Sequence, residues 1–508
     1  MFEYNYKRRS SRPVKVGDII IGGGKPVVIQ SMTNTSTMDT AASARQIKRI
    51  ADAGGELVRL TTQGTREAAN LVPIREAARA LGCNVPVSAD VHFNPNAAFE
   101  AARTADKVRI NPGNFVDAAR TFKKLEFSEE EYRGEIERIR QTLVPFLNLC
   151  RENGVAVRLG VNHGSLSDRI MSRYGDTPAG MVESVMEFLR IAREEDFNDI
   201  VISIKASNTV VMVETVRLLV EEMDKEGMDF PLHLGVTEAG NAEDGRIKSA
   251  VGIGALLHAG LGDTIRVSLS EPPENEIPVA IMLRDHVARR ALAPAVVPPD
   301  SVLPGKSRDY ADKSLKYREF YIDDSRKIGQ LAADIDSFVT GGGKNPVRLA
   351  IRYDSLDLDE LRVMAGADFG ALLMAGYGSD LRVIDDNFDK GTLDRLAADI
   401  LQAARLKFYK TEYIACPGCG RTLFDLQSTL AEVKEALADI GVEGLKIGVM
   451  GCIVNGPGEM ADADYGYVGA GPGRVSIYRG KELITKNIPT EEALPALLTL
   501  IKSDLKPE

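Results

Sequence analysis

The chain has 508 residues, 44% of them hydrophobic and 27% charged, which is typical of a globular protein with roughly two or three domains. Its 73 acidic residues outnumber its 63 basic ones, and the net charge of −10 argues against a broad nucleic-acid or anionic-membrane surface. The basic run near the N-terminus has no apolar segment behind it, and no later stretch approaches the ~18–20 apolar residues of a membrane span. We therefore expect a soluble, cytoplasmic protein.

Between residue 26 and about residue 292, short apolar strands alternate with segments of helical period. The expected strands are 26–32, 56–62, 85–92, 107–113, 156–162, 199–207, 231–238 and 264–270. Eight such units predict an α/β fold of the closed (β/α)8, TIM-like type, with an open doubly wound sheet as the alternative. Residues 14–24 are expected to form a hairpin over the lower end of this barrel. The first domain is predicted to span residues 1–292.

Each expected strand begins apolar and becomes polar at its C-terminal end, which is the face where barrel active sites form. The polar residues there are Asn34, Arg59, Asp90, His92, Arg109, Asn111, Arg158, Asn162, Lys205, Asn208, Glu238, Arg266 and Ser268. Any one Arg alone could be a surface salt bridge, but five cations on five strands would repel one another without an anion. Because Arg suits bidentate phosphate recognition, we expect a phosphorylated small molecule. No P-loop or G-x-G-x-x-G motif follows a strand, so a nucleotide is not implied.

Several residues with reactive side chains are expected to have non-catalytic roles. His92 and His163 lie near strand ends without a second ligand at metal-site spacing, which favours hydrogen-bonding roles over metal binding. His258 and His286 lie in expected helices and are predicted to be structural, as are the thiols of Cys83 and Cys150 in apolar surroundings. An odd total of five cysteines is a poor disulfide framework.

Residues 293–405 break the barrel pattern, beginning with a linker rich in Pro and charge. Within them, the segment 370–383 repeats 254–267 at nine of fourteen positions. Such an echo indicates a partial copy of the barrel's helix–strand unit, with chance similarity of two Gly-Ala-Leu-rich stretches as the alternative. We expect a small inserted α/β domain that spaces its neighbours and takes no part in catalysis.

Residues 406–508 are predicted to form a compact α+β domain with Cys416 and Cys419 in "CPGCG", Cys452 further on, and no histidine. The C-x2-C motif is typical of both zinc and iron–sulfur sites. A closed structural zinc needs a fourth Cys or His, so the fourth ligand here must be a carboxylate, water or substrate. Three thiolates on an iron–sulfur cube leave one iron exchangeable, and Glu459 is the candidate displaceable ligand. A carboxylate-completed zinc in a phosphate-binding, non-enzymatic barrel is the alternative.

The pairing of "CPGCGRT" with "GCIVNGPGE" is specific, and it lies behind a barrel that carries "VRLTT", "KVRINPGN", "VRLGVNHGSL", "SIKASN", "LGVTEAG" and "DTIRVSLSEPP". These segments resemble the family of 4-hydroxy-3-methylbut-2-enyl diphosphate synthases, iron–sulfur enzymes of the non-mevalonate isoprenoid pathway. The resemblance implies ring opening and reductive dehydroxylation of 2-C-methyl-D-erythritol 2,4-cyclodiphosphate to (E)-4-hydroxy-3-methylbut-2-enyl diphosphate. It also implies a 4Fe-4S cluster with one exchangeable iron, and two electrons from a ferredoxin or flavodoxin.

The resemblance also implies roles for individual residues. Cys416, Cys419, Cys452 and Glu459 are similar to the cluster ligands, and Glu238 to a carboxylate near the reacting carbons that donates a proton or stabilises charge. Diphosphate ligands are implied at Arg59, Arg109, Arg158, Asn162, Lys205 and Ser268. The middle insertion resembles plant-type members but is shorter, which leaves open whose barrel the cluster domain caps; we expect a homodimer. Sulfite and nitrite reductases, the competing reductases, use four cysteines and sirohaem.

Overall fold

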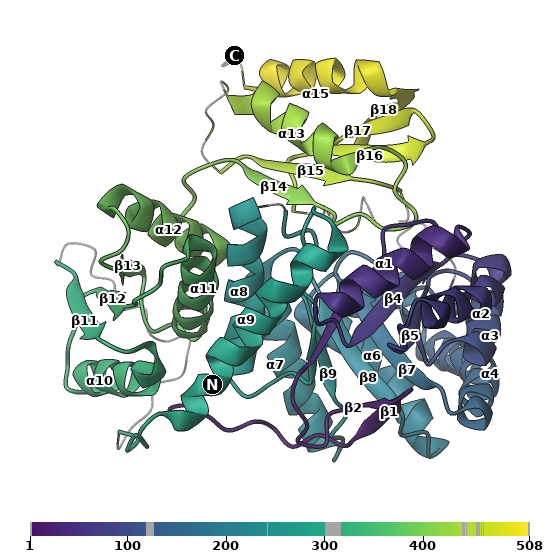
Figure 1. The fold of residues 1–508 in the computed structure, drawn as a ribbon, viewed down its shortest axis with the longest axis horizontal. Coiled ribbons are helices and arrows are strands. Elements are labelled where there is room, and N and C mark those ends of the chain that lie inside the picture. Colours follow the sequence, from purple (N-terminus) through teal and green to yellow (C-terminus); the bar gives the residue numbers. More distant parts are fainter. Residues whose placement is uncertain are drawn as a thin grey trace.

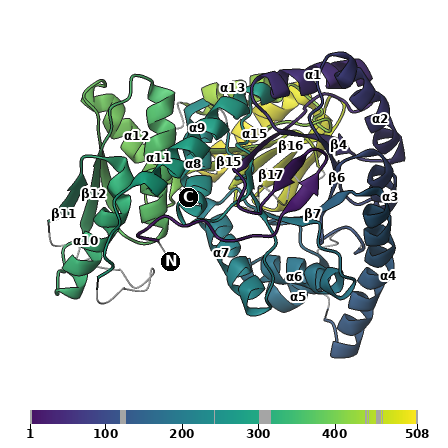
Figure 2. The same ribbon diagram turned by 60° about the horizontal axis from the view of Figure 1, so that its bottom comes forward.

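The computed structural model describes residues 3–117, 126–240, 242–299, 316–438, 442, 444–453, 458, 460 and 462–505. In these residues a two-stranded hairpin is followed by a closed eight-stranded barrel, a three-stranded sheet and a five-stranded sheet (Figure 1). The five-stranded sheet lies over one end of the barrel, and the three-stranded sheet lies beside it (Figures 1 and 2). No helix in the described part of the chain is long and apolar enough to span a bilayer.

The closed barrel confirms the expected TIM-like fold and shows that the open-sheet alternative is wrong. Its parallel strands are β3 Val28–Met32, β4 Leu57–Thr62, β5 Val87–Val91, β6 Lys107–Ile110, β7 Ala156–Asn162, β8 Ile200–Lys205, β9 Leu232–Leu234 and β10 Thr264–Ile265. The helices around it are α1 Thr40–Asp52, α2 Thr65–Ala80, α3 Pro95–Thr104, α4 Glu129–Asn153, α5 Asp168–Tyr174, α6 Pro178–Glu194, α7 Thr209–Lys225, α8 Ala242–His258 and α9 Glu276–Ala288. Short 3-10 turns, η1 Pro273–Asn275 and η2 Arg289–Leu292, flank α9.

The inside of the barrel is polar, although aliphatic side chains usually fill such interiors. Alternation along β6 turns Val108 and Ile110 toward the helices and leaves Lys107 and Arg109 on the opposite, inner side. An apolar layer is confined to the bottom, where the hairpin β1 Val14–Val16 and β2 Ile19–Ile21 packs on the strand starts. The hairpin therefore supplies the apolar seal that the barrel's own inner face lacks.

The last barrel strand is shorter than expected. Only Thr264 and Ile265 pair with neighbouring strands, whereas the sequence pattern predicted a strand over 264–270. Arg266 N still donates to Leu234 O of β9 at 3.0 Å, but further on the backbone has other partners: Leu269 N donates to Glu276 Oε1 at 3.3 Å and Ser270 N donates to Gly240 O at 2.9 Å. Ser270 Oγ also donates to Cys416 O at 3.0 Å, so the chain leaves the barrel toward the C-terminal domain.

The middle segment forms a parallel sheet of β11 Arg318–Ile322, β12 Val347–Arg352 and β13 Asp380–Ile384, with helices η4 Ser325–Lys327, α10 Ile328–Thr340, α11 Leu358–Met374 and α12 Lys390–Ala403. Its α11 packs closely on α8 of the barrel (Figure 1). A Cβ on Gly254 would lie 2.6 Å from Ala367 Cα, and one on Gly370 would lie 2.7 Å from Val251 Cα. The two echoed segments therefore begin at glycines that let these helices touch backbone to backbone.

A buried cluster of polar side chains joins α8, α9 and α11. Asp368 Oδ1 lies 3.1 Å from His258 Nε2 and 2.9 Å from His286 Nε2, and Tyr353 donates its hydroxyl to Asp368 Oδ2 at 3.1 Å. Arg290 Nη1 lies 3.3 Å from His258 Nδ1, so that nitrogen accepts and the His258 proton is on Nε2, facing Asp368. Burial opposes ionisation of Asp368, but the two imidazoles hold its pKa well below the ordinary value. The expected structural role of both histidines agrees with this contact.

The C-terminal domain has a mixed sheet in the order β14 Glu412–Ala415, β15 Lys446–Met450, β16 Tyr465–Gly471, β17 Arg474–Arg479 and β18 Glu482–Pro489. Apolar side chains of α13 Leu426–Leu437 and α15 Thr490–Asp504 pack together with the sheet in one core. Both helices lie on the side away from the barrel (Figure 1). The loops after β14 and β15 are therefore free to face the barrel mouth.

Replacing Asp368 by Asn is expected to destabilise the contact between the barrel and the middle segment. Removing one partner of a buried charged group costs about 3 kcal/mol, and the loss should appear as a lower free energy of unfolding in urea. Asp394→Asn is the matched control, because Asp394 forms an ion pair with Lys390 on the surface of α12 and its side chain is 63% exposed. Equal stability of the two variants would contradict this account.

Candidate functional site

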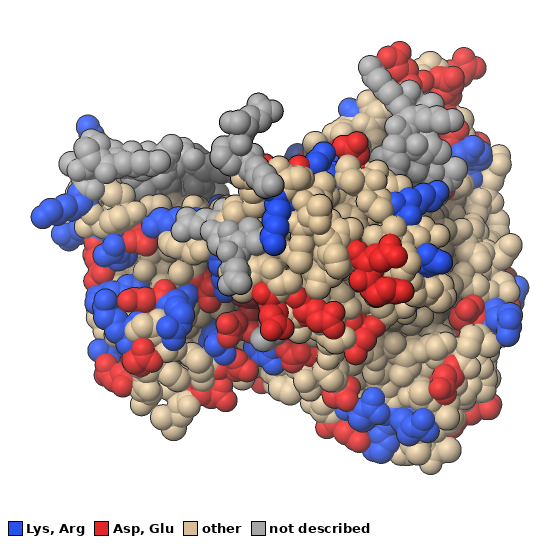
Figure 3. Space-filling model, turned by 90° about the horizontal axis from the view of Figure 1, so that it is seen from above, with Lys and Arg blue, Asp and Glu red and all other residues tan. Residues whose placement is uncertain are grey.

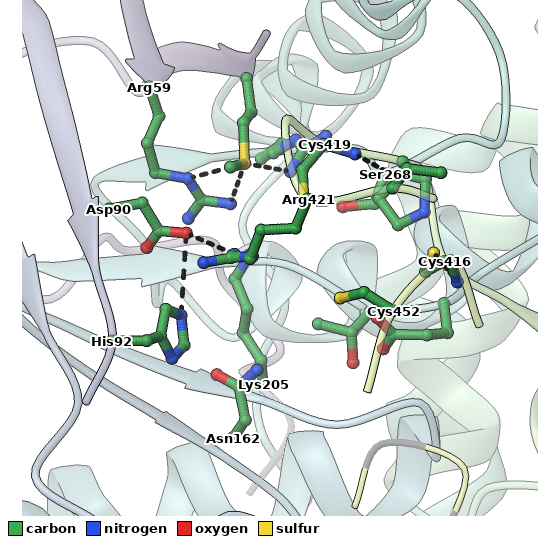
Figure 4. A pocket seen from close by; sticks show the side chains of 18 of the residues that line it. Arg59, Asp90, His92, Asn162, Lys205, Ser268, Cys416, Cys419, Arg421 and Cys452 are labelled. Carbon is green, nitrogen blue, oxygen red and sulfur yellow. Dashed lines mark hydrogen bonds and ion pairs between the residues drawn. The ribbon is translucent and has the colours of Figure 1, made fainter. Parts of the chain in front are cut away.

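A cavity of about 730 Å³, partly open to solvent, lies between the barrel mouth and the C-terminal domain (Figure 4). It is lined by Met32, Arg59, Asp90, His92, Arg109, Arg158, Asn162, Lys205, Thr237, Glu238, Arg266, Ser268, Cys416, Pro417, Gly418, Cys419, Arg421, Thr422, Met450, Gly451 and Cys452. All the residues to which the family resemblance gave a role are among them except Glu459, which lies outside the described residues.

The C-terminal domain is attached to the barrel mouth through a strained turn. Glu238 has a φ of +50°, a left-handed conformation that non-glycine residues rarely adopt. This turn brings Ala239 into a parallel bridge with Ala415, the last residue of β14. Ser270 Oγ then donates to Cys416 O at 3.0 Å. The backbone that carries the first cysteine of the motif is therefore held by two barrel loops.

The five expected strand-end cations all line the cavity and are at most 5% exposed. Arg266 is neutralised within the protein, because its Nε and Nη2 each donate to Glu276 at 2.9 Å. Burial disfavours its charge, but Glu276 outweighs burial and raises the pKa of Arg266. The sequence did not reveal this carboxylate partner, and four barrel cations are left to face the cavity.

Asp90 lies at the centre of these cations. Its Oδ1 is 3.1 Å from Arg109 Nη1 and 3.9 Å from Arg158 Nη2. Burial raises the pKa of Asp90, but Arg59 and Arg109 reverse that effect and hold it well below its ordinary value. One carboxylate cannot balance so many charges, so the mouth keeps a surplus of positive charge.

Gly160 makes room for the most constrained of these side chains. A Cβ at this position would lie 2.6 Å from Arg109 Nε and 3.0 Å from Ser203 Oγ. In its place, Gly160 O accepts from Arg109 Nη2 at 2.9 Å, and Asn162 Oδ1 accepts from the same nitrogen at 3.0 Å. The guanidinium of Arg109 is thus fixed before any ligand arrives.

The excess positive charge appears in the pKa values of the free site. Burial, followed by the charges of Arg59 and Arg158, holds the pKa of Lys205 well below its ordinary value. Burial and the neighbouring arginines also lower the pKa of Arg158, and burial lowers that of Arg59 to about 10 against the opposing effect of Asp90. A bound polyanion would reverse these effects, so the arrangement favours a small ligand with several negative charges.

The three thiols of the C-terminal domain meet at the opposite wall of the cavity (Figure 4). Cys416 and Cys452 lie just past the ends of β14 and β15, which are parallel neighbours, so both thiols emerge at one edge of the sheet. Gly451 N donates to Cys416 Sγ at 3.3 Å. Burial raises the pKa of the Cys416 thiol, so a thiolate there requires a nearby cation. Three cysteines outside any disulfide lie on one wall, and the C-terminal domain adds no further Cys or His to the described lining, which fits a metal centre with an open position.

Three further residues at the mouth are not among the ligands and catalytic residues predicted from the sequence, although a hydrogen-bonding role was expected for His92. Asp90 and His92 were expected at strand ends, and His92 contacts Arg109 through Nε2. Burial and then Arg109 lower the pKa of His92 well below its ordinary value, so its ring is neutral. Arg421 was not singled out, although it directly follows "CPGCG"; its Nη2 lies 3.4 Å from Asp90 Oδ2. Its position directly after the cysteine motif was the feature of the sequence that could have identified Arg421 as a site residue.

Three of the strand-end asparagines are absent from the described cavity lining and support loops instead. Asn34 Oδ1 accepts from Gln46 Nε2 at 2.6 Å, and Asn111 Nδ2 donates to Ser165 Oγ at 3.0 Å. Asn208 caps α7 by accepting from Val210 N at 3.0 Å. A polar residue at a strand end thus often serves the loop that follows it.

One face of the molecule differs from the cavity in its charge. On the face seen from above, acidic and basic side chains lie side by side in small groups (Figure 3). Positive charge is thus more concentrated in the buried mouth than on this face, and the chain as a whole has a net charge of −10.

Comparison with known proteins identifies relatives along the whole chain. The family model described as the GcpE TIM-barrel domain matches residues 11–281, and the GcpE protein C-terminal domain matches residues 412–503. Proteins named 4-hydroxy-3-methylbut-2-en-1-yl diphosphate synthase (flavodoxin) are similar to this chain in three organisms. The relative from Bacteroides fragilis is 48% identical, and the match covers 99% of this chain and 96% of the relative. The relative from Phocaeicola vulgatus is 47% identical, and the match covers 99% of this chain and 98% of the relative. The relative from Leptospira interrogans is 37% identical, and the match covers 99% of this chain and 98% of the relative.

These relatives are longer than this chain. The alignment with the Phocaeicola vulgatus protein spans 611 positions, whereas this chain has 508 residues, so that relative carries stretches that are absent here.

The pKa shift of Lys205 predicts how anion binding depends on pH. Because the pKa of Lys205 is lowered in the free site and raised by a bound anion, binding takes up a proton, and affinity falls as pH rises through the lowered pKa. For one proton, the affinity for inorganic diphosphate should fall by up to about tenfold per pH unit.

Calorimetric titration between about pH 7 and pH 9 in buffers of different ionisation enthalpy measures both the affinity and the proton uptake. Lys205→Arg should keep its charge to higher pH and flatten the profile. Lys48→Arg, on the exposed side of α1, is the control. Superimposable profiles for all three proteins would exclude Lys205 as the titrating group.

Proposed function

The chain belongs to the family of 4-hydroxy-3-methylbut-2-en-1-yl diphosphate synthases. We propose that the residues lining its cavity carry out the reaction of this family. The enzyme opens the ring of 2-C-methyl-D-erythritol 2,4-cyclodiphosphate and reductively removes a hydroxyl group to form (E)-4-hydroxy-3-methylbut-2-enyl diphosphate. Its two electrons come from flavodoxin, the donor in the names of its relatives.

One observation carries the assignment of this reaction to the cavity. Four barrel cations gathered around the single carboxylate of Asp90 and three cysteines outside any disulfide line the same space, which is about 730 Å³ in volume. The cations suit the binding of a diphosphate. The cysteines suit the binding of a redox metal centre, which a reduction with loss of hydroxide requires. The two functions meet only because the C-terminal domain covers the barrel mouth.

Binding of the cyclic diphosphate is assigned to the barrel. Arg59, Arg109, Arg158 and Lys205 provide the positive charge, and Asn162 and Ser268 are the neutral lining residues beside them. These side chains are preorganised by burial and by Asp90, so little conformational entropy is lost when the ligand binds. The diphosphate is remote from the reacting carbons, and its binding energy therefore orients them.

The thiols of Cys416, Cys419 and Cys452 are assigned as ligands of a 4Fe-4S cluster. When bound, such a cluster supplies electrons one at a time and a Lewis-acidic iron. Glu459 is the proposed displaceable fourth ligand. Zinc with a carboxylate is the alternative occupant, and it would leave the reduction without an electron carrier.

Glu238 is the proposed proton donor. Its side chain lines the cavity, and the residue is 3% exposed and adjacent to the loop that meets Cys416. A departing hydroxyl leaves as water only if it receives a proton, and a carboxylic acid held in a buried position is suited to that transfer. The backbone of Glu238 has an unfavourable left-handed conformation, and this conformation sets the direction of its side chain, as is common at functional sites.

The described parts of the site all come from one chain, which supports a cavity completed without a second subunit. The homodimer stays a prediction, and light scattering on the purified protein would measure it. Ferredoxin is the other donor that the family resemblance implied, and a kinetic comparison of both reduced donors would distinguish them.

Metal analysis of anaerobically purified protein tests this assignment. About four irons and four sulfides per chain, with an absorption that bleaches on reduction, and turnover of the cyclic diphosphate with reduced flavodoxin are the expected results. One zinc per chain without sulfide would overturn the cluster assignment. A complete cluster without turnover would overturn the proposed roles of the barrel residues.

Glu238→Gln is expected to lower kcat by about 10²- to 10⁴-fold, because the amide cannot donate the proton. The KM for the cyclic diphosphate should change little, since the cations that bind it are untouched. Glu243→Gln, on the exposed start of α8 with 48% of its side chain accessible, is the matched control. A large rise in KM with unchanged kcat would instead make Glu238 a binding residue.

A further inference from the structure

Arg421 connects the two halves of the site. It lies two residues after Cys419, and its side chain is 8% exposed. Its Nη2 is 3.4 Å from Oδ2 of Asp90 on β5, and its guanidinium extends from the cysteine loop toward the barrel (Figure 4). Among the described lining residues it is the one cation that comes from the C-terminal domain.

The backbone of the cysteine loop around Arg421 is held by hydrogen bonds within the loop. Cys419 N donates to Thr422 Oγ1 at 3.0 Å, and Thr422 N donates to Cys419 O at 2.9 Å. Arg421 lies between these two residues, so the turn sets the point from which its side chain starts. A cation is therefore held beside the thiols by a rigid loop and aimed at a carboxylate of the other domain.

A fixed cation beside a buried redox centre changes its reduction potential. Each one-electron reduction by flavodoxin adds one negative charge to the thiolate-bound centre, and a nearby positive charge stabilises that reduced form. The donation from Gly451 N to Cys416 Sγ acts in the same direction. The negative charge of Asp90 acts in the opposite direction, and it is shared among Arg109, Arg158 and Arg421.

We propose that Arg421 is a positioning residue with two linked effects: it fastens the cysteine loop to the barrel through Asp90, and it raises the reduction potential of the centre that the thiols hold. This inference rests on the proposed iron–sulfur function. Arg421 contacts neither the substrate nor the reacting atoms in this account; it acts through the loop and through its charge.

The midpoint potential of the cluster in substrate-free, reconstituted enzyme tests the effect of the charge. Arg421→Gln should lower the equilibrium constant for one-electron reduction about tenfold, which corresponds to a midpoint potential about 59 mV more negative. Arg421→Lys keeps the charge and should restore most of the loss. Arg474→Gln removes an exposed cation from β17 of the same domain and should leave the potential unchanged.

Asp90→Asn separates the charge effect from simple loosening of the loop. This variant breaks the same ion pair as Arg421→Gln, so amide hydrogen exchange in residues 416–424 should rise in both. The potential should move in opposite directions, because one variant removes a positive charge and the other a negative one. Potentials that shift together, or an Arg421→Gln potential equal to that of the unsubstituted enzyme, would overturn the inference.

Iron and sulfide analysis distinguishes this test from that of the function itself. If the unsubstituted enzyme holds no cluster, the proposed function fails and takes this inference with it. If it holds a cluster and the substitutions leave its potential unmoved, only the role of Arg421 fails. If Arg421→Gln does not retain a cluster, Asp90→Asn decides alone: a less negative potential supports the charge effect, and an equal or more negative one overturns it.

Discussion

Burial of several like charges at one barrel mouth is the constraint on which the rest of this structure depends. Arg59, Arg109, Arg158 and Lys205 are nearly excluded from water, and their repulsion is relieved only in part by Asp90. Such a site is costly without its ligand and favourable with it, because an anion removes both the repulsion and part of the desolvation cost. The barrel tolerates this cost because its apolar stabilisation comes from the outer helical layer and from the hairpin below.

The covering domain is held over the barrel mouth by backbone contacts and by ion pairs, among them Lys248 Nζ at 2.7 Å from Glu412 Oε1. The bridge between Ala239 and Ala415 and the hydrogen bond from Ser270 to Cys416 use backbone groups, which leave little freedom in distance or direction. Glu238 is strained into a left-handed conformation at the same turn. The residue proposed for proton transfer and the loop proposed for metal binding are thus positioned by one local structure.

The middle segment supports this arrangement from the side. Its α11 lies against α8 through glycines that permit close backbone approach, and the Asp368 cluster adds a buried polar contact. The echo between 254–267 and 370–383 then has a physical meaning, because the two copies begin in the helices that face each other. The segment contributes no side chain to the described cavity lining.

The sequence by itself determined the strand–helix alternation of the barrel, the cations at its strand ends and the three thiols, because period, residue type and spacing are local properties. It also carried the family resemblance that the comparisons confirm. Only the tertiary structure decided that Glu276 neutralises Arg266, that Asp90 gathers the remaining arginines, and that Arg421 crosses from one domain to the other. These pairings join residues on separate elements or separate domains, and no local pattern encodes which buried charges will meet once the chain has closed.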